Sequence, residues 1–218
     1  MKDYSNYHGL NDHEKLTHDG LLLLQKSLNG FEGYDALIND TVEAKVLMYQ
    51  KWDANSETKK VIGHISDIVQ GNILKIDGLN WLITTFPEDN KVYRKAEMKL
   101  CNALFPITSD KIPDLLRDEN GNLIRDDYGR PIPIESGGEK KLEPCVVETR
   151  PALSQQTEQI RLPEDKILVT LRYQESKSLQ INSEFDMYNS RFRIIFTDFS
   201  KVINGVGVMT LTGERLVN

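Results

Sequence analysis

Long hydrophobic runs are absent from this sequence, and their absence narrows the classes of protein to which it can belong. The longest apolar run is Leu21-Leu22-Leu23-Leu24, far short of the ~20 residues that cross a bilayer as a helix. The first residues, Met1-Lys2-Asp3-Tyr4-Ser5-Asn6, contain neither the apolar core nor the small-residue cleavage site of a secretion signal. We therefore expect a soluble protein that is made in the cytosol and has no membrane partner.

Cysteine is scarce, with Cys101 and Cys145 as the only two. In a reducing compartment such residues are expected to be buried or half-buried thiols. A disulfide would require a different compartment, and a metal site would require further ligands beside the two thiols. The sequence does not say whether Cys101 and Cys145 meet in space.

An excess of basic residues is also missing, because the 218-residue chain has a net charge of -6. Proteins whose main task is to grip a phosphate backbone usually carry more lysine and arginine than acid. Arg191 and Arg193 flank Phe192, but one such group is less than the basic stacking surface that single strands require. A cytosolic nucleic-acid-binding module is therefore an alternative interpretation, and it predicts steeply salt-dependent DNA affinity.

The 4 histidines do not form a recognisable site. His8, His13 and His18 recur every five residues, which turns successive side chains by about 140° on a helix and separates them. His64 is isolated in a strand-like stretch, and no Gly-x-Ser-x-Gly elbow offers a nucleophile beside a base. We predict no catalytic residue, no metal ligand, no cofactor and no enzymatic activity. An intracellular enzyme with an unfamiliar site is the alternative, which a pocket holding a titratable pair would reveal.

A cluster of acids near the middle of the chain has the density of a calcium-binding loop. Asp118-Glu119-Asn120-Gly121-Asn122 is followed by Asp126 and Asp127. Counted from Asp118, however, the glycine stands at position four instead of six, and position twelve is Gly129 where an EF-hand needs a bidentate glutamate. The pattern therefore predicts a tight turn with solvated carboxylates.

The hydrophobic period changes along the chain from helical to strand-like. Residues 12–28 contain good helix formers and end at Asn29-Gly30, although Gly20 could divide them into two helices. Alternation over residues 42–48 and an Asp77-Gly78 turn between two apolar runs then predict strands and a hairpin. Residues 91–104 fit either a helix or a strand, with a strand favoured at their end. Most of the strand aromatics are expected in the core: Trp52, Trp81, Phe86, Phe185, Phe192 and Phe196.

The fold class that these patterns predict is mainly β, with small barrel or sandwich modules, an N-terminal helical segment and a long projecting loop. Turn formers such as Pro113 and Ser136-Gly137-Gly138 recur too often between the modules for a long regular element. We expect this arm to become ordered against a partner. The predicted divisions are a helical segment over 1–40, a first β module over 41–108, the arm over 109–150 and a second β module over 151–218.

One stretch of the chain resembles a motif of tailed-bacteriophage neck proteins. The run from Ile65 to Ile83, which includes Gly71-Asn72-Ile73-Leu74-Lys75-Ile76 and Trp81-Leu82-Ile83, is similar to a hairpin of small β-barrel head-closure and head–tail connector proteins. Asn72 stands where those proteins usually have an acidic residue. The continuation from Pro87 to Asn102 and the C-terminal hairpin also resemble virion proteins of phages of Gram-positive hosts.

This resemblance implies a structural virion protein of the phage neck, assembled in the host cytoplasm. Its copies would form a ring between head and tail that helps to seal or transmit the DNA channel. The implied partners are copies of the chain itself, the portal or adaptor protein, and tail proteins, while DNA passes through without specific binding. Another virion position, such as a tail-completion or tail-associated ring protein, is the alternative.

Overall fold

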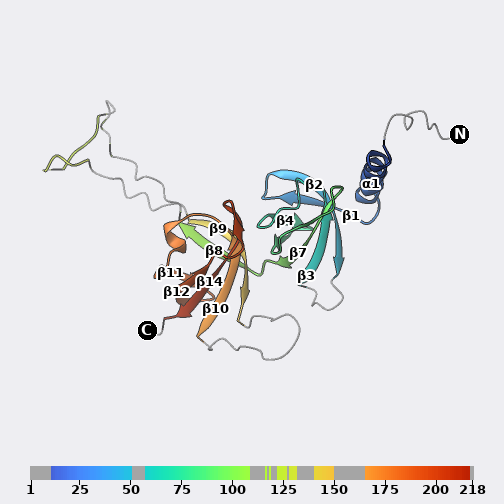
Figure 1. Ribbon diagram of the computed structural model, residues 1–218. Coiled ribbons are helices and arrows are strands. Elements are labelled where there is room, and N and C mark those ends of the chain that lie inside the picture. Colours follow the sequence, from blue (N-terminus) through green and yellow to red (C-terminus); the bar gives the residue numbers. More distant parts are fainter. Residues whose placement is uncertain are drawn as a thin grey trace.

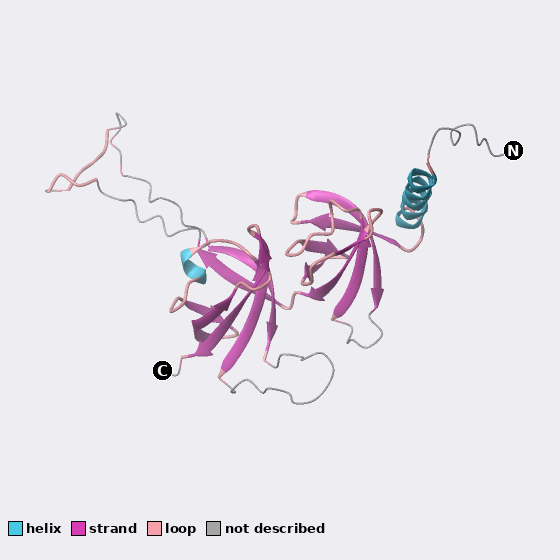
Figure 2. Cartoon of the chain, in the orientation of Figure 1, coloured by secondary structure: helices cyan, strands magenta, loops and turns pink. Residues whose placement is uncertain are grey.

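The computed structural model describes residues 11–50, 57–108, 116, 118, 122–126, 128–131, 140–149 and 165–216. These residues form two β modules and an N-terminal α-helix, which confirms the predicted fold class (Figures 1 and 2). Within these ranges, no helix has the length and apolar character needed to cross a membrane. Trp52, one of the aromatics considered for the core, lies outside the described residues.

Helix α1 runs without a break over Asp12–Leu28. The Asn11 side chain caps its start by accepting a hydrogen bond from the Glu14 N–H at 2.9 Å. Gly20 does not divide the helix. A Cβ atom there would lie 3.2 Å from a methyl group of Val92, so glycine permits the close approach of the helix to this loop.

The first module is a closed antiparallel barrel, because β3, at one end of the strand order, also pairs with β7 near the other end. The hydrogen-bonded order is β3-β2-β1-β4-β5-β7-β6. The strands are β1 Gly33–Ile38, β2 Val42–Gln50, β3 Thr58–Gly63, β4 Ile73–Ile76, β5 Leu79–Ile83, β6 Glu88–Asp89 and β7 Arg94–Leu100. Closure removes the exposed strand edges that would otherwise pair with other chains.

Local chemistry accounts for the turn between β4 and β5 and for the stretch 91–104, which fitted either a helix or a strand. Asp77 and Gly78, with φ angles of 49° and 78°, form the tight turn that the sequence predicts between β4 and β5. The ambiguous stretch 91–104 is strand over Arg94–Leu100, because alternate residues Ala96 and Met98 are buried in the barrel. His64 lies just after β3 and not within a strand.

The second module is a curled sheet of order β11-β12-β14-β10-β9-β8. Its elements are β8 Ala103–Thr108, β9 Lys140–Glu148, β10 Lys166–Arg172, a 3-10 helix η2 Lys177–Leu179, β11 Glu184–Met187, β12 Ser190–Asp198, β13 Val202–Ile203 and β14 Val206–Arg215. The sheet curls until its two outer strands meet in the core. There the ring of Phe105 lies 4.8 Å from that of Phe185, which stacks on Phe192 at 5.6 Å.

The structure corrects the predicted division of the chain at two places. Strand β1 belongs to the first barrel, although residues 1–40 were assigned to the helical segment. Strands β8 and β9 belong to the second sheet, although residues 103–108 were assigned to the first β module and the predicted arm extends to residue 150. Cys145 and Val147 alternate toward the core of that sheet, and the interrupting proline at position 144 concealed this period in the sequence.

Two aromatics that were expected in the core are exposed. Phe86 and Phe196 have 68% and 57% of their surface accessible. Along β12, Phe192 and Ile194 alternate into the core, and Phe196 should continue that series. A β-bulge between Ile194 and Phe196 shifts the register by one residue, which turns Phe196 outward. A sequence pattern of period two cannot anticipate such a shift.

The two modules meet through a small apolar cluster and through a linker that is held by side-chain hydrogen bonds. Ile73 and Leu82 of the first barrel pack against Val146 and Val208 of the second sheet. In the linker, the Asn102 side chain makes the pair of hydrogen bonds that a strand residue makes with its backbone. Its amide nitrogen donates to the Val147 carbonyl at 2.9 Å, and its carbonyl accepts from the Val147 N–H at 2.8 Å.

Backbone contact and an ion pair complete this junction. Lys99 Nζ lies 2.6 Å from Glu148 Oε1 across the junction, with both side chains partly buried. Gly71, at φ +88°, approaches Gly207 so closely that a Cβ atom would lie 2.2 Å from the Gly207 carbonyl oxygen. Only glycine at position 71 satisfies both the left-handed backbone and this distance.

We predict that Gly71→Ala destabilises the protein more than Gly78→Ala. Both positions have positive φ, which costs an alanine about 1–2 kcal/mol. Gly78 faces open space, whereas the new methyl at position 71 collides with backbone of the other module, which adds about 1–3 kcal/mol. Urea unfolding measures the difference. Equal losses for both variants would show that the modules do not meet at Gly71.

Candidate assembly surfaces

The two thiols are buried at the junction between the modules. Cys145 lies in the core and Cys101 is half-buried at the edge of the junction cluster, and both are free. Desolvation raises the pKa of each thiol to about 12. Neither sulfur is therefore a nucleophile near neutral pH. The expectation of two buried or half-buried thiols is confirmed.

The described histidines stand apart from one another. His13 and His18 are exposed on α1, where His18 Nδ1 lies 3.6 Å from Asp19 Oδ1. His64 lies in the loop after β3, and His8 is outside the described residues. Among the residues whose placement is known, no three His, Cys, Asp or Glu side chains lie close enough to hold a metal ion.

The acidic cluster of the arm forms turns, as its spacing predicts. Asp118 Oδ1 accepts a hydrogen bond from the Asn122 N–H at 2.8 Å. Asp126 Oδ1 accepts two more, from the N–H groups of Tyr128 and Arg130. These carboxylates hold the backbone of a short hairpin instead of converging on a cation. We call residues 122–131 the arm hairpin, of which the structure describes 122–126 and 128–131.

Glu143 is the most deeply buried ionisable group in the described residues that carries a charge partner. Its side chain is 2% exposed and lies 2.7 Å from Arg172 and 3.2 Å from Lys141. The Arg172 contact is ionic, without the alignment of a hydrogen bond. Glu143 is therefore a paired buried charge of the second module and not an isolated one.

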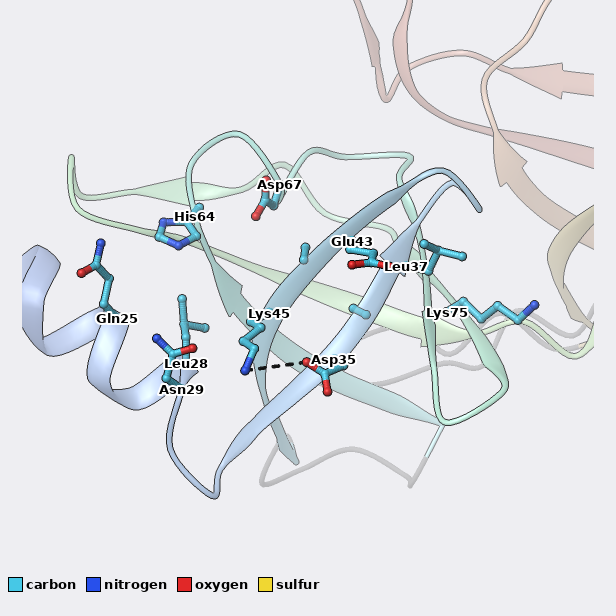
Figure 3. Close-up of a pocket in the computed structure, with 12 residues that line it drawn as sticks. Gln25, Leu28, Asn29, Asp35, Leu37, Glu43, Lys45, His64, Asp67 and Lys75 are labelled. Carbon is cyan, nitrogen blue, oxygen red and sulfur yellow. Dashed lines mark ion pairs between the residues drawn. The ribbon is translucent and has the colours of Figure 1, made fainter.

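An open groove of about 810 Å³ lies between the end of α1 and the first barrel (Figure 3). We call it the N-terminal groove. Figure 3 shows Gln25 and Asn29 from the helix on one side, with His64 and Asp67 on another. Lys45 Nζ lies 3.8 Å from Asp35 Oδ1, but that carboxylate is 91% exposed, so the pair contributes little. No serine, threonine or cysteine is among its described lining residues.

Helix α1 presents leucines to solvent. Leu24 and Leu28 are buried against Leu47 of the barrel, whereas Leu16 and Leu23 are 71% and 65% exposed. Leu16 and Leu23 are seven residues apart and therefore share a helix face. Figure 1 shows the helix on the outer side of the first barrel, away from the second module. An uncovered pair of this kind is typical of a surface that contacts another protein.

A second open groove, which we call the C-terminal groove, has a volume of about 950 Å³. It lies between residues 173–181 and the end of β12. Buried Leu179 and Met209 form its floor, and Ile181 and Phe199 stand exposed at its rim. An apolar floor below an exposed apolar rim favours a protein segment over a charged ligand.

The basic–aromatic group considered for nucleic acids is not a stacking surface. Phe192 is buried, and its ring stacks on Phe185 inside the second module. Arg191 and Arg193 point to the opposite face, where both pair with Glu184 at 2.8 and 3.1 Å. The aromatic and the two cations therefore do not present one common face to a base and its phosphate.

Two family models match this chain, and together they span most of it. The YomX N-terminal domain matches residues 6–100, and the YomX C-terminal domain matches residues 118–214. The chain is also similar to the SPbeta prophage-derived protein YomX of Bacillus subtilis (strain 168). The two are 33% identical over 219 residues, which cover 100% of this chain and 98% of that protein.

Among solved structures, the chain matches that of K. pneumonia MrkH. The alignment covers 93% of this chain and 85% of that one, with 9% sequence identity and a TM-score of 0.24. A TM-score this low does not establish a common fold.

We predict that both cysteines resist thiol reagents in the folded protein. With a pKa of about 12, only about one thiol in ten thousand is ionised at pH 8. A colorimetric disulfide reagent should react slowly until urea exposes both thiols. Rapid reaction of the folded chain would contradict their burial. Because the raised pKa belongs to the folded state, stability is retained below pH 9.0, the ordinary thiol pKa, and falls as pH rises from there toward 12.

Proposed function

The chain belongs to the YomX family, and from this premise we propose that it is a structural virion protein of the phage neck. In this proposal its copies form a ring that joins the portal to the tail and helps to seal or transmit the DNA channel. The protein acts by assembly and not by catalysis. The prophage origin of its relative from Bacillus subtilis supports the phage part of this proposal.

The observation that carries the proposal is the exposed leucine face of α1. Leu16 and Leu23 are exposed on a helix that is anchored to the barrel through Leu24 and Leu28. Leu23 also borders a groove between the helix and the barrel. A folded protein that leaves such a face open gains free energy when another chain covers it. Phe31, which follows the helix, is 98% exposed as well.

The charge of the chain supports a channel position. A net charge of -6 repels a phosphate backbone at long range, so DNA can slide through a ring of such subunits without being held. The pairing of Arg191 and Arg193 with Glu184 agrees with this, because it reduces the local positive charge.

Gene deletion in the phage that encodes this chain tests the neck position. We expect lysates with DNA-filled heads and separate tails, because the joint between them is missing, and electron microscopy counts the two particles. The wild-type gene supplied in trans should restore virions. Normal virions without the gene would contradict the proposal, and a protein found only in purified tails would favour the tail-completion alternative.

We predict that Leu16→Asp with Leu23→Asp abolishes this rescue. Charges placed on the open helix face keep water there and prevent another chain from covering it. Leu79→Asp is the matched control, because Leu79 is 50% exposed but lies on the β4–β5 hairpin. Thermal melting of both purified variants should stay close to wild type, since the substituted side chains are exposed. Rescue by the helix variant would show that the leucine face is not an assembly surface.

A further inference from the structure

The apolar contact between the two modules is small. Its buried cluster consists of four residues, Ile73, Leu82, Val146 and Val208. Two domains of one chain that share a small interface are expected to move relative to each other unless something else restrains them. The hydrogen bonds of Asn102 to Val147 provide one such restraint at the linker. A second restraint comes from the loop that precedes β4.

Residues 64–72, which we call the junction loop, connect β3 to β4 and contact the second module. Gly71, near the end of the loop, lies directly against the Gly207 carbonyl oxygen. On its other side the loop is held by the first barrel, because the Gly71 N–H donates to the Ile83 carbonyl of β5 at 2.9 Å. The position of the loop on the first barrel therefore decides where the second module can lie.

Asn72 fixes the junction loop through both ends of its side-chain amide. Its Oδ1 accepts from Asn39 Nδ2 at 3.1 Å, and its Nδ2 donates to the Asp67 carbonyl at 3.2 Å. Asn39 also holds the next strand, because its Oδ1 accepts from the Ile73 N–H at 3.0 Å. The two asparagines thus connect the β1–β2 turn, the junction loop and the start of β4, where Ile73 enters the junction cluster.

An aspartate at position 72 cannot make the same pair of contacts. A carboxylate accepts from Asn39 as the amide does, but it has no proton to donate to the Asp67 carbonyl. Its second oxygen would face that carbonyl oxygen with no proton between them, and an acceptor that loses its donor costs free energy. The geometry therefore requires the amide and not only a polar side chain of the same shape.

We propose that the junction loop is a conformational restraint in which Asn72 is the positioning residue that keeps the two modules in contact. When the amide is lost, the loop shifts, Gly71 moves away from Gly207, and the junction cluster opens. His64 and Asp67 of this loop also line the N-terminal groove, so the loop connects that groove with the junction. This restraint acts within one chain and does not depend on the neck assignment.

The two native cysteines report the opening of the junction. Cys101 packs against the junction cluster, whereas Cys145 lies in the core of the second module. Opening of the junction exposes Cys101 alone, while unfolding of the chain exposes both thiols. We expect Asn72→Asp to raise the rate at which iodoacetamide modifies Cys101 about tenfold, the effect of one lost hydrogen bond on an equilibrium, and to leave Cys145 slow. Mass spectrometry of the digested protein measures the label at each cysteine.

Asn90→Asp is the matched control for this measurement. The Asn90 Oδ1 atom accepts from the N–H groups of Val92 and Tyr93 at 3.1 and 2.9 Å. A carboxylate keeps both of these bonds, while the net charge of the chain changes as it does in Asn72→Asp. Cys101 in this control should therefore react as slowly as in the wild-type protein.

Two further variants reach the junction by other routes. Gly71→Ala places a methyl group against the Gly207 carbonyl oxygen, which pushes the modules apart and should expose Cys101 without any change at the asparagines. Asn39→Asp removes the hydrogen bond that is donated to Asn72, and it provides the same test if Asn72→Asp does not fold. Circular dichroism establishes that each variant is folded.

The result expected is selective reaction of Cys101 in Asn72→Asp and in Gly71→Ala, and not in Asn90→Asp. If Cys101 reacts as slowly in Asn72→Asp as in the control, the junction does not depend on the amide and the proposal is overturned. Equal acceleration at Cys101 and Cys145 would also overturn it, because the whole chain would then be unfolding and the junction would not be opening by itself.

Discussion

The arrangement of the two modules depends on the side chain of Asn102. Its amide donates to and accepts from the backbone of Val147, at 2.9 and 2.8 Å, and so adds one rung of a β-ladder to strand β9. The linker between the barrels is thereby paired like a strand. The apolar cluster around Leu82 and Val146 and the approach of Gly71 to Gly207 depend on this pairing, because each requires the barrels to stay in one orientation.

A fixed junction has consequences for how the chain can assemble. Strand β9 lies at the junction and also borders the arm, since residues 109–139 come between β8 and β9 in the sequence. In Figure 1, α1 and β12 lie toward opposite sides of the molecule. Surfaces at opposite ends favour head-to-tail contacts, and such contacts close into a ring only when each subunit contributes the same angle. The linker that Asn102 pairs with β9 would keep the angle between the two modules the same in each subunit.

Sequence patterns predicted the parts of this fold that are governed by local chemistry. The Asp77-Gly78 turn, the end of α1 and the carboxylate turns around Asp126 were each predicted from a few neighbouring residues. Features that depend on distant partners were missed. The bulge that exposes Phe196 is a matter of register with β14, and the hydrogen bond between Asn39 and Asn72 joins segments that only the fold brings together.

The candidate surfaces differ in how far their occupant can be specified. The leucines of α1 require only apolar cover, which many chains could supply, so that face carries affinity more than specificity. The C-terminal groove is lined by polar residues as well as apolar ones, so it demands more of an occupant. Because the two surfaces lie on different modules, a substitution in one is expected to leave the other unchanged.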